Sequence, residues 1–161
     1  MLETLVVIAI IGMATVVAIP YFAKLSRRQR LVGAAHEIQQ SLLAARMRAV
    51  RANQNTSLVI VAATAADPRH ELGTVAPDNS PAPLPTPVSR AYISASTVEF
   101  VTLPLNNKVT FAGDGRVIAP PAPTPGVITV QGPVGSTLLN QVTIRANSTG
   151  RIEVVTPAVW Q

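Results

Sequence analysis

The chain has 161 residues and a formal net charge of +5, with 13% charged residues, 48% apolar residues and no cysteine. This length predicts one domain with an appendage. Without cysteine the chain has no disulfides, thiolate chemistry or zinc–thiolate site, so its stability has to come from packing and assembly.

The first expected element is an apolar helix at the N-terminus. From Thr4 to Ala23, twenty residues carry no charge. As a helix they would extend over ~30 Å, the thickness of the hydrocarbon core of a bilayer. A secretory signal peptide would have basic residues before the run and a small-residue cleavage site after it, and neither is seen here. We predict that residues 1–23 form a retained hydrophobic helix, in a membrane or in a filament core.

The helical pattern continues after this run. Apolar residues recur at steps of three and four, which is typical of one face of an amphipathic helix over residues 24–53: Leu31, Ala35, Ile38, Leu42, Ala45 and Ala49. We therefore predict a single helix from Leu2 to about Ala52. Pro20 lies inside it, and because proline removes one backbone hydrogen bond, we expect the helix to bend or melt locally there.

The positive charge is concentrated on this helix. Residues 24–51 include seven basic residues and one acidic residue, whereas residues 52–161 include six of each. Basic residues beside an apolar segment more often anchor anionic lipid headgroups than read nucleic acid.

Residues 54–161 are predicted to form a β-rich globular head. β-branched runs indicate strands at 56–63, 91–103 (with a break), 108–111, 116–118, 127–131, 141–146 and 151–155. Two proline-rich segments, 77–87 and 119–126, cannot pair in a sheet and are expected to be exposed loops. Serine or threonine beside proline in these loops, as at Ser80, Thr86 and Thr124, is either a glycan site or part of a plain solvated loop.

A short internal repeat lies in the second half of the chain. VTFAGDGRV (109–117) and VTIRANSTGRIEV (142–154) share a V-T-apolar segment, a polar turn and a G-R-apolar segment. We predict two similar hairpins in one sheet, with Gly115 and Gly150 at positive φ.

These segments together resemble a known family. LETLVVIAIIG followed by AIP is similar to the N-terminal helix of type IV pilins and type II secretion pseudopilins, and FAKLSRRQRLVGAAHEIQQSLLAARMRAVRANQNTSLVIV resembles their GspH/FimT-like branch. The resemblance implies an α+β fold, a pilin-like ladle in which a long N-terminal helix with an apolar first half packs on an antiparallel β-sheet. The family's basic leader is not in this sequence, and Glu3 lies two positions nearer the start than the family pattern, which we interpret as a missing start.

The resemblance also implies a function. The chain would be a structural subunit of a bacterial type IV pilus or type II secretion pseudopilus that polymerises through its N-terminal helix. Its implied partners are copies of itself, other pilins, prepilin peptidase, the inner-membrane assembly machinery and, before assembly, the lipid bilayer. It would be N-methylated after processing, start in the inner membrane and end in a periplasmic or cell-surface filament.

Assembly roles are expected for several residues of the apolar helix. A carboxylate in lipid costs roughly 2.5–3.5 kcal/mol on insertion scales, so Glu3 requires a cation, which a neighbouring subunit's N-terminal ammonium would supply. Pro20 would let the helix stretch or bend on leaving the bilayer. The side chains of Val6, Val7, Ile10, Ile11 and Val17 would face lipid first and other helices later, and Gly12, with Ala9 and Ala14, would allow close helix approach.

An enzyme is not expected. The two histidines, His36 on the helix and His70 in a predicted loop, accompany no catalytic motif. Asp67, Asp78 and Asp114 are scattered over predicted turns, so neither a cofactor nor a metal site is predicted.

The alternative function is a membrane-anchored minor-pilin tip, adhesion or DNA-capture module. Some FimT-like minor pilins are thought to bind DNA through a G-R-x-R element, which here reads Gly150, Arg151, Ile152, Glu153. Because a glutamate replaces the second arginine, only weak nucleic-acid contact through Arg145 and Arg151 is considered.

Overall fold

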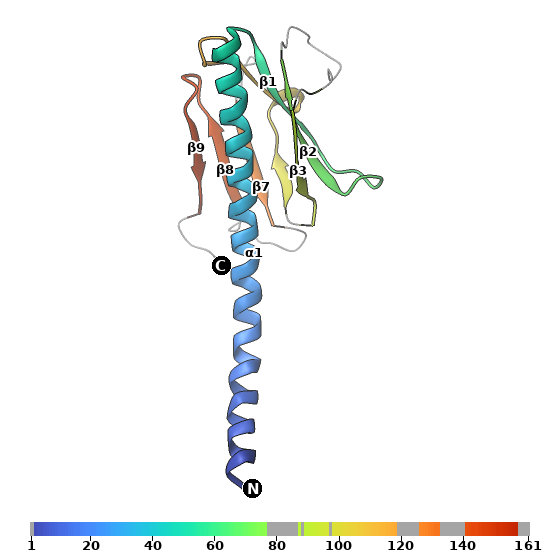
Figure 1. Ribbon diagram of the computed structural model, residues 1–161, viewed down its shortest axis with the longest axis vertical. Helices are drawn as coiled ribbons and strands as arrows, with labels where there is room; N and C mark the ends of the chain where they lie inside the picture. Colours follow the sequence, from blue (N-terminus) through green and yellow to red (C-terminus); the bar gives the residue numbers. More distant parts are fainter. Residues whose placement is uncertain are drawn as a thin grey trace.

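The computed structural model describes residues 2–76, 87, 89–96, 98–118, 126–132 and 141–157. Helix α1 (Leu2–Ala52) has 51 residues, and its second half lies along the β-rich head while its first half extends beyond it (Figure 1). We call residues 2–25 the stalk. The α+β ladle expected from the sequence is confirmed. Apart from Pro87 and Gly126, the two proline-rich loops lie outside the described residues.

The prediction of local melting at Pro20 is wrong for the free chain. Helix α1 is continuous from Leu2 to Ala52, and Figure 1 shows no sharp bend in it. Proline removes a single intrahelical hydrogen bond, and the turns on both sides keep their own. The large apolar side chains of the stalk that the structure describes are exposed, so their packing does not favour an unwound form.

Two antiparallel sheets form the head. The first has the order β3-β2-β1-β5-β6, with bounds β1 Thr56–Val61, β2 Arg69–Val75, β3 Ser89–Ser94, β5 Lys108–Phe111 and β6 Val117–Ile118. The second has the order β4-β7-β8-β9, with bounds β4 Glu99–Thr102, β7 Val127–Gln131, β8 Gln141–Ala146 and β9 Ile152–Val155. A short 3₁₀ helix, η1 (Leu105–Asn107), precedes β5.

The chain changes sheets within the predicted strand 91–103. Residues 89–94 form β3 in the first sheet, and residues 99–102 form β4 in the second. The break expected in this segment is therefore confirmed. Strand β2 was not predicted, because RHELGTV contains few β-branched residues and begins with charged ones.

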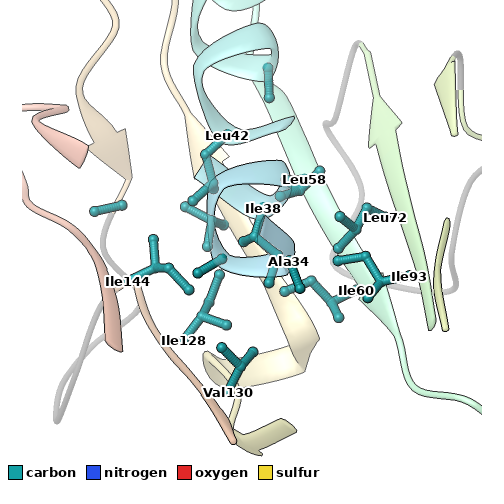
Figure 2. Packing of buried hydrophobic residues seen from close by; sticks show 14 of the residues in the cluster. Ala34, Ile38, Leu42, Leu58, Ile60, Leu72, Ile93, Ile128, Val130 and Ile144 are labelled. Carbon is teal, nitrogen blue, oxygen red and sulfur yellow. The ribbon is translucent and has the colours of Figure 1, made fainter. Parts of the chain in front are cut away.

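The core lies where the helix meets both sheets. The six helix residues of the predicted apolar face are all buried, at 0–2% exposure. Figure 2 shows Ile38 and Leu42 of α1 between Leu58, Ile60, Leu72 and Ile93 of the first sheet and Ile128, Val130 and Ile144 of the second. The helix thus joins two sheets that would otherwise each have an uncovered apolar face.

The internal repeat consists of two hairpins with the same turn. Gly115 N–H donates to Ala112 O, and Gly150 N–H donates to Asn147 O, both at 2.8 Å. The φ angles are +82° at Gly115 and +81° at Gly150, as predicted. The prediction that both hairpins belong to one sheet is wrong: β5–β6 lies in the first sheet and β8–β9 in the second. Similar turns fix the geometry of each hairpin, whereas neighbouring strands decide which sheet it joins.

Candidate assembly surface

The stalk presents apolar side chains around its whole circumference. Val6, Val7, Ile10 and Ile11 are 49–62% exposed. Five further stalk residues that the sequence argument did not single out are more exposed still: Ile8, Met13, Val16, Ile19 and Phe22. The sequence did contain a signal for these five residues, because a helix that is apolar on every side exposes apolar side chains on every face. An apolar surface of this extent marks an interaction site.

Small and polar residues of the stalk leave room for a neighbouring helix. A Cβ built on Gly12 would meet nothing within 4 Å, so the backbone there is open to close approach. The hydroxyl of Thr15 donates to Ile11 O at 2.7 Å, so it is satisfied within the helix. The structure does not describe the side chains of four stalk residues: Ala9, Val17, Pro20 and Lys24.

Glu3 lies in the first turn of α1 and is exposed. A carboxylate in the first helical turn lies near the positive end of the helix dipole, an arrangement that stabilises the helix. In a bundle of apolar helices this charge would be desolvated, and it would then need a cation from another chain. Its assembly role stays a prediction.

Among the described residues, no helix has the length and apolar composition needed to cross a membrane, so the predicted membrane span is not confirmed.

Charges on the head are paired locally. Four arginines lie beside carboxylates at 2.7–3.5 Å: Arg69 with Asp67, Arg90 with Glu71, Arg116 with Asp114 and Arg151 with Glu153. The side-chain hydrogen bond from Arg69 lowers the pKa of Asp67. These pairs are solvated and add little stability, but they leave the head surface close to neutral.

The two arginines considered for nucleic-acid contact are both close to a glutamate. Arg145 on β8 stands opposite Glu153 on β9 in the strand register. The Nε of Arg151 lies 2.7 Å from Glu153 Oε1. Glu153 therefore lies beside both cations, and its charge opposes an approaching phosphate.

The histidines have structural surroundings. His36 is exposed, with Nδ1 at 3.2 Å from Gln39 Oε1. His70 lies on β2 and is buried, so its predicted place in a loop is wrong. Ala63 N–H donates to His70 Nδ1 at 2.9 Å, so the ring hydrogen lies on Nε2, which donates to Val98 O at 3.0 Å. The ring ties together segments of both sheets.

Asp114 is a turn residue, as predicted. Its Oδ1 accepts a hydrogen bond from Arg116 N–H at 2.9 Å. Asp78 lies outside the described residues. Among the residues that the structure describes, no group of three His, Asp or Glu side chains lies close enough to hold a metal ion.

Arg46 makes a contact that was not predicted from the sequence. It projects from α1, and its Nε donates to Gly115 O at 3.1 Å. A Cβ on Gly150 would lie 3.0 Å from the same Nε, so both repeated turns meet at this guanidinium. Arg46 is one of three arginines between residues 46 and 51, and the sequence does not distinguish it from Arg48 and Arg51.

The ladle fold, the apolar stalk and the head of two antiparallel sheets define a pilin-like protein. A sequence model of the GspH family, described as type II transport protein GspH, matches residues 34–150, more than two thirds of the chain. The chain belongs to this family.

A solved structure has the same fold. The crystal structure of the type IV minor pilin FimU of Pseudomonas aeruginosa (strain PAO1) aligns with a TM-score of 0.53 and 22% identity, over 84% of this chain and 95% of FimU. No curated protein matches the chain.

Proposed function

We propose that this chain is a structural subunit of a type IV pilus or type II secretion pseudopilus, and that its stalk packs against the stalks of other subunits. One observation carries the proposal: the stalk exposes apolar side chains on all its faces, with Val6, Val7, Ile10 and Ile11 about half exposed or more. No core of its own chain covers them. Family membership supports assembly with other pilins.

Packing of stalks would remove this surface from water. Burial of apolar surface is favourable by roughly 25 cal/mol per Å², so two helices of this composition associate without directional contacts. Gly12 adds a site of close approach, because nothing stands within 4 Å of its missing Cβ. Pro20 would absorb a bend where a stalk in a filament has to follow its neighbours.

Engineered cysteines test this packing, because the chain has none of its own. Ile10→Cys on the stalk should give disulfide-linked dimers when filaments sheared from cells are oxidised. Val61→Cys, at a site on the head that is also partly exposed, is the matched control and should give far fewer. Filaments in which Ile10→Cys stays entirely monomeric would contradict stalk packing.

Glu3 would set the register between subunits. Paired with the N-terminal ammonium of a neighbour, its carboxylate tolerates burial, and any other register leaves the charge unpaired. Glu3→Ala should abolish or slow filament assembly while the head stays folded. Glu37→Ala removes the same charge from the head part of the helix and should leave assembly unchanged. Electron microscopy of sheared filaments measures both, and normal filaments from Glu3→Ala would rule out this role.

Family membership supports a cellular route for this subunit. Prepilin peptidase would cut and methylate the precursor, and the inner-membrane assembly machinery would move the subunit into a periplasmic or surface filament. A tip, adhesion or DNA-capture role remains the alternative function. The local pairing of Arg151 with Glu153 weighs against DNA capture through that hairpin.

A further inference from the structure

The part of α1 that lies on the head has a second row of apolar side chains on its exposed side. Leu43, Met47 and Val50 follow one another at steps of four and three, and they are 38–53% exposed. Residues at these steps are neighbours along one side of a helix. The row is separate from the buried face, where Leu42 and Ala49 have no exposed surface. We call Leu43, Met47 and Val50 the head row.

The head row continues the apolar surface of the stalk. Helix α1 is continuous, and since about 18 residues make five full turns of an α-helix, residues 18 apart lie on the same side of it. Val7, Leu25 and Leu43 have this spacing, and all three are exposed. Between Leu25 and Leu43 this side of the helix carries no Lys, Arg, Asp or Glu, and three residues lie on it: Gln29, Val32 and His36.

The exposed side of the same helix also has a cationic part. Arg48 and Arg51 are exposed, and each lies about 100° around the helix from its neighbour in the head row, Met47 or Val50. Neither arginine takes part in an ion pair among the residues that the structure describes. The exposed surface of α1 on the head is therefore divided lengthwise into an uncharged side and a cationic side.

We propose that the stalk of a second copy of this chain packs along the head row, and that the cationic side stays in water. Residues 4–23 of the stalk carry no charge. Against Arg48 and Arg51, such a helix would remove two cations from water and bring no carboxylate to pair with them. Against the head row, it covers apolar side chains and desolvates no charge. This contact rests on the proposed function and adds to it the side of the head helix that a neighbour covers.

A stalk fits the head row better than a second head row does. A stable interface has about 20–30 residues on each side, so three side chains pressed against three others would not hold two copies together. A stalk in this position also packs on other stalks, which provide the remaining area. Because Leu43 lies about 27 Å of helix beyond the end of the stalk at Leu25, a parallel neighbour has to be displaced along the axis by at least that distance.

Cysteines placed on two differently tagged copies test the contact. One copy carries Leu43→Cys, and the other carries a single cysteine on its stalk. Four exposed stalk positions are used in turn: Ile8, Met13, Val16 and Ile19. Filaments are sheared from cells that make both copies and are oxidised, and the disulfide-linked pairs that contain both tags are quantified. Ala44→Cys is the matched control, because it is exposed and only one position away but lies about 100° around the helix.

At least one stalk position should link to Leu43→Cys several-fold more efficiently than to Ala44→Cys. Equal yields from the two head positions would overturn the proposal. Links between two Leu43→Cys copies alone would overturn it as well, since two head rows would then be in contact. If Ile10→Cys forms dimers while Leu43→Cys links to no stalk position, only the contact with the head row is wrong. If Ile10→Cys also stays monomeric, the proposed stalk packing is wrong.

A charge added to each side of the helix gives a second test. Met47→Lys places a cation in the head row and should lower the yield of sheared filaments several-fold, because a neighbouring stalk would bury that charge without a partner. Ala44→Lys adds the same charge toward the cationic side and should leave the yield close to that of the wild type. Both positions are exposed, so circular dichroism should show both heads folded. Equal yields from the two variants would contradict the contact.

Discussion

Two glycines and one arginine hold the far end of the head together. Arg46 Nε donates to Gly115 O at 3.1 Å, and Val117 N–H donates to Ser148 O at 3.3 Å between the two turns. A Cβ on Gly150 would overlap the carbonyl oxygen of Gly115. Glycine is required at Gly150 for two reasons, the positive φ and the contact between the turns.

Substitution at this glycine should therefore be costly. Gly150→Ala should lower the free energy of unfolding by about 2 kcal/mol or more, through a strained backbone and displacement of the neighbouring turn. Gly33→Ala is the control: it lies in α1 with nothing within 4 Å of the added Cβ, and it should stabilise by up to ~1 kcal/mol. Urea unfolding followed by circular dichroism measures both, and a Gly150→Ala variant as stable as the wild type would contradict the turn contact.

His70 is a structural residue that joins both sheets. Its ring accepts from Ala63 N–H and donates to Val98 O, and it meets Phe100 edge to face with centroids 4.7 Å apart. Ala63 follows β1, whereas Val98 and Phe100 lie at the start of the second sheet. The pairing depends on a contact between residues 28 positions apart, so the sequence around His70 gave no indication of it.

At the scale of elements, one face of α1 determines how the head packs. Its apolar stripe covers both sheets, and the adjacent face stays in water (Figure 2). Leu42 and Leu43 illustrate the division, with exposures of 0% and 38%. Two leucines next to each other in the sequence therefore have very different surroundings.

This division gives a matched pair of substitutions. Leu42→Ala leaves a cavity between the sheets and should lower the free energy of unfolding by about 2–5 kcal/mol. Leu43→Ala removes a partly exposed side chain and should cost less than about 1 kcal/mol. The urea concentrations at which the two variants unfold should differ clearly. If they unfolded at the same urea concentration, the register of the helix on the sheets would be wrong.

At the scale of the whole molecule, the chain divides into a folded head, which includes the second half of α1, and a stalk whose described large apolar side chains are exposed. The core begins at Leu31, and the stalk before it is exposed. Head stability therefore does not depend on the stalk, whereas the behaviour of the full chain in water does.

Removal of residues 1–25 should show this directly. The fragment 26–161 should keep the sheet signal in circular dichroism and stay monomeric in water, since its core is intact. The full chain should associate without detergent, because its stalk stays exposed. Analytical ultracentrifugation compares the two. A truncated head that fails to fold would mean that the stalk contributes to the core.

The sequence by itself determined the elements that repeat with a simple period. Steps of three and four defined the buried face of α1, β-branched runs defined most strands, and the repeated turn motifs placed Gly115 and Gly150 at positive φ. The apolar stalk was evident because local composition alone specifies it. These features depend on residues close together in the chain.

Only the tertiary structure decided how these elements combine. Strand pairing assigned the two similar hairpins to different sheets, brought Arg46 onto both turns and buried His70 between segments from both sheets. The structure also has α1 continuous through Pro20. Contacts between residues far apart in the chain are set by the packing of all elements at once, and no local pattern encodes them.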